Sequence, residues 1–253
     1  MNYCTVSFDK KFLEKVKAMK QNKLNVDLTN SYYNDNDIVD EHDAEPIKSK
    51  DDINRICMYL LKEKRYRDYC LFIIGINTGL RIYDILHLSV GDLVNEDGTF
   101  KDEMILMEHK TKNTRKTKVN RHISINNSIK KAVKILLDNG NYSLNDYLFT
   151  SNSNRCTYEY KSGIKVKSPL KRQSVDFIFK GIAKDLNLNF RFATHSLRKT
   201  FGYNVIKMNQ DNPRSLQLLQ KIFNHSSPSI TLRYVGITSD EINKTYNDLN
   251  LGI

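Results

Sequence analysis

The chain has 253 residues, and 40 Lys and Arg against 29 Asp and Glu give it a net charge of +11 and a pI of about 9.3. No apolar run approaches the about 20 residues needed to cross a bilayer, which excludes a membrane-spanning protein. The N-terminus has no secretory signal pattern, and the four Cys are too scattered for a disulfide scaffold or a zinc site. We therefore expect an intracellular protein with a polyanionic partner.

The charge is unevenly distributed along the chain. Residues 1–23 carry six Lys and a net charge of +4, and their apolar residues recur at helical spacing, which predicts an amphipathic basic helix. Residues 24–47 contain seven acidic and no basic residues, a composition typical of a flexible linker. Such a linker is either a solvated spacer or a cover for a basic surface when nucleic acid is absent. The remaining residues, 48–253, carry +14 and form the predicted domain.

The first part of this domain is mostly helical by periodicity, with one interruption. Ser49, followed by two Asp, is a typical helix start, and Gly79 is a typical helix end. Alternation of apolar and polar residues after the turn at Asp97-Gly98 predicts strands. In chain order we expect helices from Ser49, over 66–77 and over 82–87, strands at 104–107 and 121–125 around the basic loop 110–118, and a helix over 128–138.

The second part begins with a polar, basic segment, 152–173, which we expect to be a loop. Helical patterns then return, and the last helix has Ser239 as its N-cap with two acidic residues in its first turn. The predicted fold is mainly α with one small antiparallel β-sheet, of the α+β class. The helices are expected over 174–186, 195–208, 214–223, 228–235 and 239–249.

Two arginine segments are candidates for chemistry. Arg81 follows a glycine helix end, and Asp84 lies one helical turn further on, where it can brace the guanidinium. His195 and Arg198 are three residues apart on one helix, so a proton carrier and an anion binder share a face. Each pair taken alone is better explained as ordinary polar surface.

The other candidates are His225, Tyr234 nine residues later, and a lysine of the predicted hairpin loop, Lys110 or Lys112. Together the segments fit the attack of a tyrosine hydroxyl on a DNA phosphodiester. Its transition state carries extra negative charge, which two guanidiniums and an imidazole can offset. The tyrosine must lose a proton and the leaving 5′-oxygen must gain one, a task for His and Lys side chains.

In this order the segments resemble the tyrosine recombinases, also called phage integrases. The residues that carry the resemblance are T-G-L-R at 78–81, the hairpin lysine, H-S-L-R-K-T-F-G at 195–202 and N-H-S-S-P-S-I-T-L-R-Y at 224–234. The resemblance covers about residues 48–253. Within the family, the chain is most similar to the small integrases of Gram-positive mobile elements.

The resemblance implies the tyrosine recombinase catalytic-domain fold and a role for each candidate. Tyr234 would form a 3′-phosphotyrosyl bond, and no metal or other cofactor would be needed. The other implied roles are phosphate binding by Arg81, Arg198 and His225, proton transfer by His195, general acid catalysis by Lys110 with Lys112 as the alternative, and support of the arginines by Asp84.

The implied activity is site-specific recombination or integration of duplex DNA, without ATP. The partners would be duplex DNA and other copies of the chain, in a dimer to tetramer whose members exchange the helix 239–249. The location would be the cytoplasm, at the nucleoid, or the host cytoplasm for a phage-encoded protein. Non-catalytic regulation of DNA and nicking-closing topoisomerase activity are the alternatives.

Two departures from the family pattern affect these expectations. Only 47 residues precede the catalytic region, where family members usually carry a longer helical domain that clamps DNA. We therefore expect DNA recognition to depend on the basic surface of the domain, with segment 152–173, or on an accessory DNA-binding protein. Asn224 also occupies a position where Gly is commoner.

Overall fold

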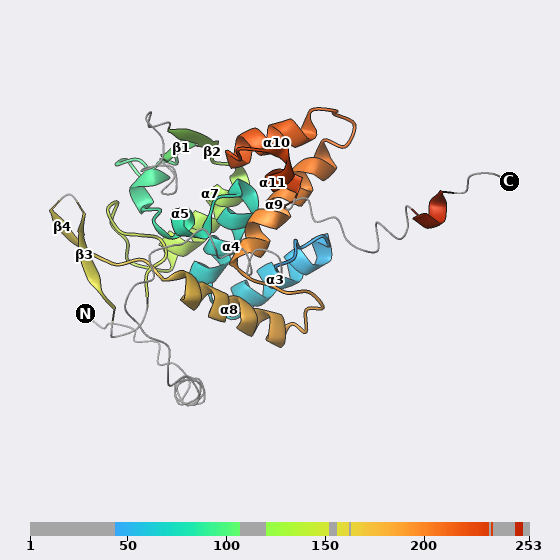
Figure 1. Ribbon diagram of the computed structural model, residues 1–253. Coiled ribbons are helices and arrows are strands. Elements are labelled where there is room, and N and C mark those ends of the chain that lie inside the picture. Colours follow the sequence, from blue (N-terminus) through green and yellow to red (C-terminus); the bar gives the residue numbers. More distant parts are fainter. Residues whose placement is uncertain are drawn as a thin grey trace, which may run out of the picture. The chain divides into compact units, whose positions relative to one another are not determined.

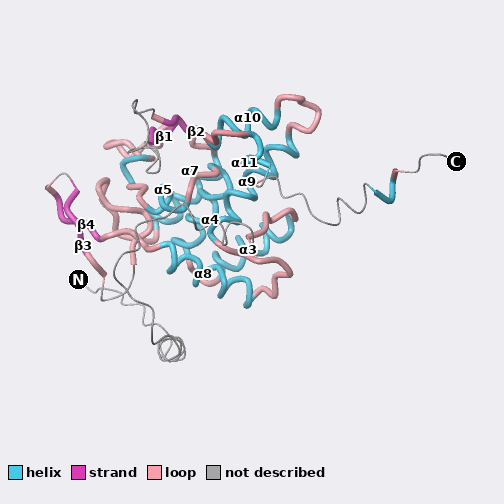
Figure 2. Tube along the Cα trace, viewed as in Figure 1, coloured by secondary structure: helices cyan, strands magenta, loops and turns pink. Residues whose placement is uncertain are grey.

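A computed structural model describes residues 44–106, 120–151, 156–161, 163–232, 234 and 246–249, which are mainly helical with two small sheets (Figures 1 and 2). The predicted α+β class is therefore confirmed. The basic helix 1–23, residues 24–43 of the linker, the loop 110–118 and most of the helix 239–249 lie outside the described residues. Among the described helices, none combines the length and the apolar character that a membrane crossing requires.

The central element is α4, Tyr66–Thr78, which is buried continuously from Cys70 to Gly75. A helix that is apolar on nearly every side must be covered by others. It contacts α3 (Lys50–Lys62), α5 (Ile82–Leu86), α7 (Asn127–Asp138) and α9 (Thr194–Met208), while α8 (Arg172–Asp185) packs against α9. These helices enclose the main hydrophobic core.

Most predicted helices are confirmed to within about two residues at each end. Ser49 caps α3 by accepting hydrogen bonds from the backbone N–H groups of Asp51 and Asp52. The helix expected over 228–235 is shorter in the structure, where α11 covers Pro228–Leu232. A 3₁₀ turn, Val90–Asp92, follows α5 and completes the first half of the domain.

The domain contains two antiparallel strand pairs, whereas one was predicted. The expected pair is formed by β1 (Glu103–Leu106) and β2 (Arg121–Ser124). The second pair, β3 (Tyr158–Lys161) and β4 (Ile164–Lys167), lies in the segment predicted to be a loop. The prediction of a loop was wrong although the sequence alternates: Tyr158, Tyr160, Ile164 and Val166 are each followed by a charged residue, on either side of a glycine turn. Among the described residues of this hairpin only Val166 is buried.

The first described residues pack against the domain, although they were predicted to belong to the acidic linker. Ala44 and Ile47 are buried. The backbone N–H of Ile47 donates to Oγ1 of Thr200 on α9 at 2.8 Å. The packed part of the chain therefore starts at least four residues earlier than the sequence predicted.

A second, smaller hydrophobic cluster joins the C-terminal half of α9 to α10 (Ser215–Phe223) and α11. Its fully packed members are Leu219, Phe223 and Tyr234. Three of the sequence candidates, Arg198, His225 and Tyr234, lie on or next to these helices. This cluster therefore positions much of the candidate site.

Candidate active site

The turn that ends α4 requires a glycine. Gly79 has a φ of 59°, in the left-handed region. A Cβ there would lie 2.5 Å from Cδ1 of Phe201 and 2.8 Å from Cε1 of Phe223, too close for any side chain. The turn leads directly to Arg81, which begins α5, and to Asp84 in its first turn. The predicted helix end and the placement of Arg81 are both confirmed.

Arg198 lies at the centre of the site and is only 2 % exposed. Its Nη1 donates to the backbone carbonyl of Gly79, and its Nη2 donates to the carbonyl of Phe223 at 3.0 Å. The guanidinium also lies 3.9 Å from the centroid of the Phe223 ring. One buried cation thus links the ends of α4 and α10 to α9.

His225 follows α10 and contacts Arg198 directly. Its Nε2 lies 3.3 Å from Nη2 of Arg198, and its Nδ1 lies 3.1 Å from Oγ1 of Thr231. Because a guanidinium has only donors, Nε2 must accept, which assigns the proton to Nδ1 and makes Thr231 its acceptor. The backbone at His225 is held by Gln220, whose carbonyl accepts from it at 3.1 Å.

Tyr234 packs into the same group of side chains and is only 6 % exposed. Its ring centroid lies 5.0 Å from that of His225 and 5.2 Å from that of Phe223. The guanidinium carbon of Arg198 lies 5.5 Å from the same tyrosine centroid. The backbone N–H of Tyr234 donates to the carbonyl of Thr231 at 2.9 Å, which continues the turn of α11.

A glycine on α9 allows the backbone of Tyr234 to approach this closely. A Cβ at Gly202 would lie 3.0 Å from the carbonyl oxygen of Tyr234, tighter than ordinary contacts. Gly202 follows Arg198 by four residues, one helical turn, on the same side of α9. The helix that carries the buried cation therefore also provides the surface against which the tyrosine packs.

His195 lies in the first turn of α9, one turn before Arg198, and is partly buried. The start of the helix is fixed because the N–H of Thr194 donates to Oδ1 of Asp176 at 2.9 Å. The predicted pairing of His195 and Arg198 on one helix is confirmed by the extent of α9.

Lys110 and Lys112 lie outside the described residues. The strands on either side of their segment pair in register, with Leu106 opposite Arg121. The strand pair on which this part of the prediction depends is therefore present, whereas the roles of the two lysines stay predictions.

Two contributors to the site were missed by the sequence reasoning: Phe223, whose ring and carbonyl both contact Arg198, and Thr231, the acceptor for His225. A signal for Thr231 was available, since it precedes Tyr234 by one helical turn. No sequence signal distinguishes Phe223 from any other apolar residue of α10. Asn224 has a φ of 56°, so it adopts the left-handed helix end that Gly would usually occupy.

The arrangement brings together a buried guanidinium, an imidazole and a phenol. The two nitrogen groups can bind oxygen atoms of a tetrahedral anion, and the phenol can supply a nucleophile. Within the described part of the chain, no group of three or more His, Cys, Asp or Glu is placed to hold a metal ion.

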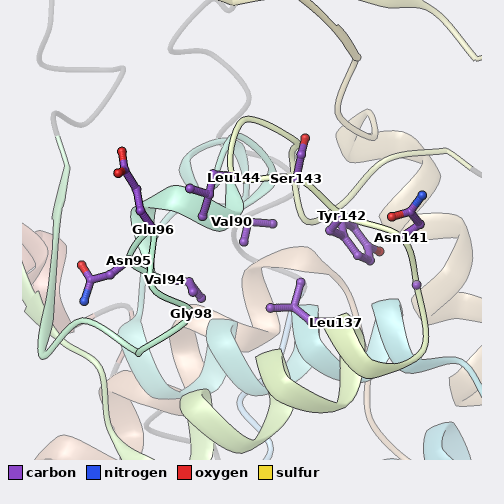
Figure 3. Close-up of a pocket in the computed structure, with 11 residues that line it drawn as sticks. Val90, Val94, Asn95, Glu96, Gly98, Leu137, Asn141, Tyr142, Ser143 and Leu144 are labelled. Atoms are coloured by element: carbon purple, nitrogen blue, oxygen red, sulfur yellow. The ribbon is translucent and has the colours of Figure 1, made fainter.

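A separate hollow of about 350 Å³ lies between the 3₁₀ turn and the segment that follows α7 (Figure 3). Figure 3 shows Leu137 pointing into it from α7, with Val90 and Leu144 on the opposite side. Burial raises the pKa of the lining residue Tyr142 to about 12, so its hydroxyl stays protonated near neutral pH. None of the candidate residues lines this hollow, and we assign no chemistry to it.

Comparisons with known proteins give a consistent result. The family described as "Phage integrase family" matches residues 48–241. "Probable integrase/recombinase YoeC" of Bacillus subtilis (strain 168) is 37 % identical over 205 residues, which are 81 % of this chain and 96 % of that protein. "Probable integrase/recombinase" of Acholeplasma phage L2 is 29 % identical over 208 residues, 79 % of this chain and 62 % of the relative.

Solved structures share the fold. XerA recombinase aligns with a TM-score of 0.55 at 18 % identity, over 81 % of this chain and 65 % of the other. XerH, a site-specific recombinase bound to difH substrate in a pre-cleavage complex, aligns with a TM-score of 0.52 at 17 % identity. The alignment covers 81 % of this chain and 54 % of the XerH chain. The chain thus spans less than two thirds of these solved chains.

Proposed function

This chain belongs to the phage integrase family, and we propose that it is a site-specific recombinase that uses Tyr234 to cleave and rejoin duplex DNA. The observation that supports this most strongly is the packing of Tyr234, His225 and Arg198 against one another, with ring centroids 5.0 Å apart and the guanidinium 5.5 Å from the phenol ring. A tyrosine that served only as core would not need a buried cation and an imidazole beside it.

The proposed reaction is a transesterification in two steps. The Tyr234 oxygen attacks the phosphorus, a bond from phosphorus to tyrosine forms, and the bond to the 5′-oxygen breaks. His195 takes the tyrosine proton, and Lys110, or alternatively Lys112, gives a proton to the leaving 5′-oxygen. A 5′-hydroxyl from another strand then reverses these steps. The number of phosphoester bonds is conserved, so the cycle needs no ATP.

Arg198, Arg81 and His225 are proposed to bind the nonbridging oxygens, where they offset the charge of the transition state without a metal ion. Asp84 is proposed to brace the arginines. For Arg198 this requires that its Nη groups exchange a backbone carbonyl for a phosphate oxygen. For His225 it requires that Nε2, an acceptor in this structure, carries a proton when DNA is bound. Nε2 can gain that proton by uptake of a second proton or by a change of tautomer, in which Nδ1 accepts from the hydroxyl of Thr231.

The proposed partners are duplex DNA and other copies of the chain, which form a dimer to tetramer on paired sites and exchange the C-terminal helix 239–249. This is supported by relatives whose structures are described as DNA complexes, among them XerH with difH and a lambda integrase dimer on a core site. An accessory DNA-binding protein and a cytoplasmic location belong to the same proposal.

The test is covalent trapping. Nicked suicide duplexes tiled across the DNA that flanks the gene are incubated with the protein and separated under denaturing conditions. We expect a protein–DNA adduct that Tyr234→Phe abolishes. Arg198→Lys should reduce the adduct by at least 100-fold while lowering DNA affinity only modestly, because the bidentate fork acts mainly in the transition state. Specific binding without any adduct would instead indicate a non-catalytic regulator.

A further inference from the structure

The β3–β4 hairpin presents two tyrosines and two lysines on one face. Tyr158 pairs with Lys167 and Tyr160 pairs with Lys165, and side chains at paired positions point to the same side of a sheet. Tyr158 is 51 % exposed and Tyr160 is 76 % exposed. Both lysines are exposed, and no acidic residue belongs to this face. We call these four residues the outer face of the hairpin.

The opposite face holds the hairpin on the domain. Val166 is buried, and Oε1 of Glu159 accepts a hydrogen bond from the hydroxyl of Tyr147 at 2.7 Å. Nζ of Lys161 lies 5.1 Å from the centroid of the same Tyr147 ring. Burial, and then the bond to Glu159, raises the pKa of the Tyr147 hydroxyl, so it remains a donor across the physiological range. These contacts fix which face of the hairpin is turned outward.

The same anchor connects the hairpin to the element that carries Arg81. The ring of His87 lies 5.8 Å from that of Tyr147 and stacks at 4.0 Å on Tyr83, a residue of α5. Its Nδ1 is also 2.7 Å from the carbonyl of Tyr83. Figure 1 shows the hairpin projecting beyond the helices on the side of the domain where α5 lies. The outer face is thus held in a defined position relative to the helix that Arg81 begins.

We propose that the outer face binds the sugar–phosphate backbone of duplex DNA. This rests on the proposed function, because it assumes that duplex DNA is the substrate. Lys165 and Lys167 donate to phosphate oxygens, and the hydroxyls of Tyr158 and Tyr160 donate to adjacent phosphates or sugars. The head group of Lys165 lies 4.9 Å from the Tyr158 ring centroid, which keeps it close to the strand.

Charge and composition favour DNA over a protein partner for this face. Lysine is depleted in protein–protein interfaces, whereas phosphate backbones are bound by Lys together with Tyr and other polar side chains. Exposed aromatic rings bordered by cations are complementary to a surface that alternates apolar sugars with anions. Contacts of this kind add affinity without selecting a base sequence.

The test measures the salt dependence of binding to a 30-base-pair duplex of arbitrary sequence. Each phosphate contact contributes about 0.9 to the slope of log affinity against log salt. The double variant Lys165→Gln, Lys167→Gln should therefore lower the slope by about 1.8. The affinity ratio between parent and variant should shrink by about ten-fold between 50 and 200 mM salt.

The matched control is the double variant Lys131→Gln, Lys134→Gln on α7, because it removes the same amount of charge from two exposed positions. The proposal is supported if only the hairpin variant loses slope. Equal slopes for the parent and the hairpin variant, or an equal loss in the control, would overturn it and leave the proposed function intact. Failure of the parent itself to bind duplex DNA would overturn both. Thermal unfolding of each variant confirms that the exposed substitutions leave the fold intact.

Discussion

At the scale of single residues, the site depends on the orientation of one imidazole. His225 is held on one side by Nη2 of Arg198 at 3.3 Å and on the other by Oγ1 of Thr231 at 3.1 Å. Thr231 is fully buried, so water does not replace its oxygen readily. With a proton on Nδ1, His225 donates to that oxygen, and in the other neutral tautomer the Thr231 hydroxyl donates to Nδ1. Thr231 is therefore a positioning residue for His225 in the proposed mechanism.

Substitution of Thr231 tests this relation. Thr231→Val keeps the volume of the side chain and removes the hydroxyl that accepts from His225. Loss of this buried hydrogen bond costs about 1 to 2 kcal/mol, which should slow formation of the covalent adduct about ten-fold. Thr231→Ser keeps the hydroxyl and should restore most of the rate. DNA affinity, measured by gel shift, should be the same for both. Equal rates for the Val and Ser variants would contradict the positioning role.

The residues of the site differ in how far the sequence could predict them. Arg198, His225 and Tyr234 occur in motifs whose order predicted the site, and the structure brings them together. Phe223 could not be identified, because its contact with Arg198 arises only when α10 packs against α9. Asn224 was noted as a departure, and its φ of 56° explains why an amide side chain is accepted where glycine is commoner.

At the scale of elements, helices were predicted well and one hairpin was missed. Helices such as α3 bury one stripe and α4 buries nearly all sides, so both patterns are visible in a single sequence. Among the described residues of the β3–β4 hairpin only Val166 is buried, and Glu159 and Lys161 form further inward contacts. The residues of each strand do alternate between apolar and charged, but Tyr158 and Tyr160 pair with lysines, so the two strands do not share one apolar face.

The close approach of α9 to Tyr234 leads to a prediction at the same scale. Gly202→Ala should displace the backbone of Tyr234 by a few tenths of an ångström and slow adduct formation several-fold. Unfolding stability should change by less than about 1 kcal/mol, because alanine also favours the helix by about that amount.

Gly181→Ala on α8 is the control, since nothing lies within 4 Å of a Cβ at that position. It should raise stability by about 0.5 to 1 kcal/mol and leave the rate of adduct formation unchanged. If Gly202→Ala reacted at the parent rate, the close contact would have no bearing on the position of the nucleophile.

At the scale of the whole molecule, the packed domain begins before the family match at residue 48. Ile47 is fully buried and its N–H donates to Thr200 on α9, the helix that carries Arg198. Composition could not predict this, because Ile47 and Ala44 follow an acidic run that is typical of linkers. The boundary depends on two buried side chains rather than on average charge.

Two shortened chains test the boundary. A chain of residues 48–253 should be about 2 to 3 kcal/mol less stable to urea than a chain of residues 44–253, from the burial of Ile47 and its hydrogen bond. Urea unfolding followed by circular dichroism measures the difference. Identical midpoints for the two chains would show that residues 44–47 contribute nothing to the domain.

The division of the hydrophobic interior into two clusters has a consequence for how the molecule loses activity. Tyr234 belongs to the smaller cluster, with Leu219 and Phe223, and not to the core around α4. Small packed units open with less free energy than the global unfolding reaction. Heat or mild denaturant should then inactivate the protein through local opening of α10 and α11, while amide protons of α4 are still protected from exchange. Catalytic competence and global folding would thus be two separate equilibria in this chain, and selection could adjust the first without altering the second.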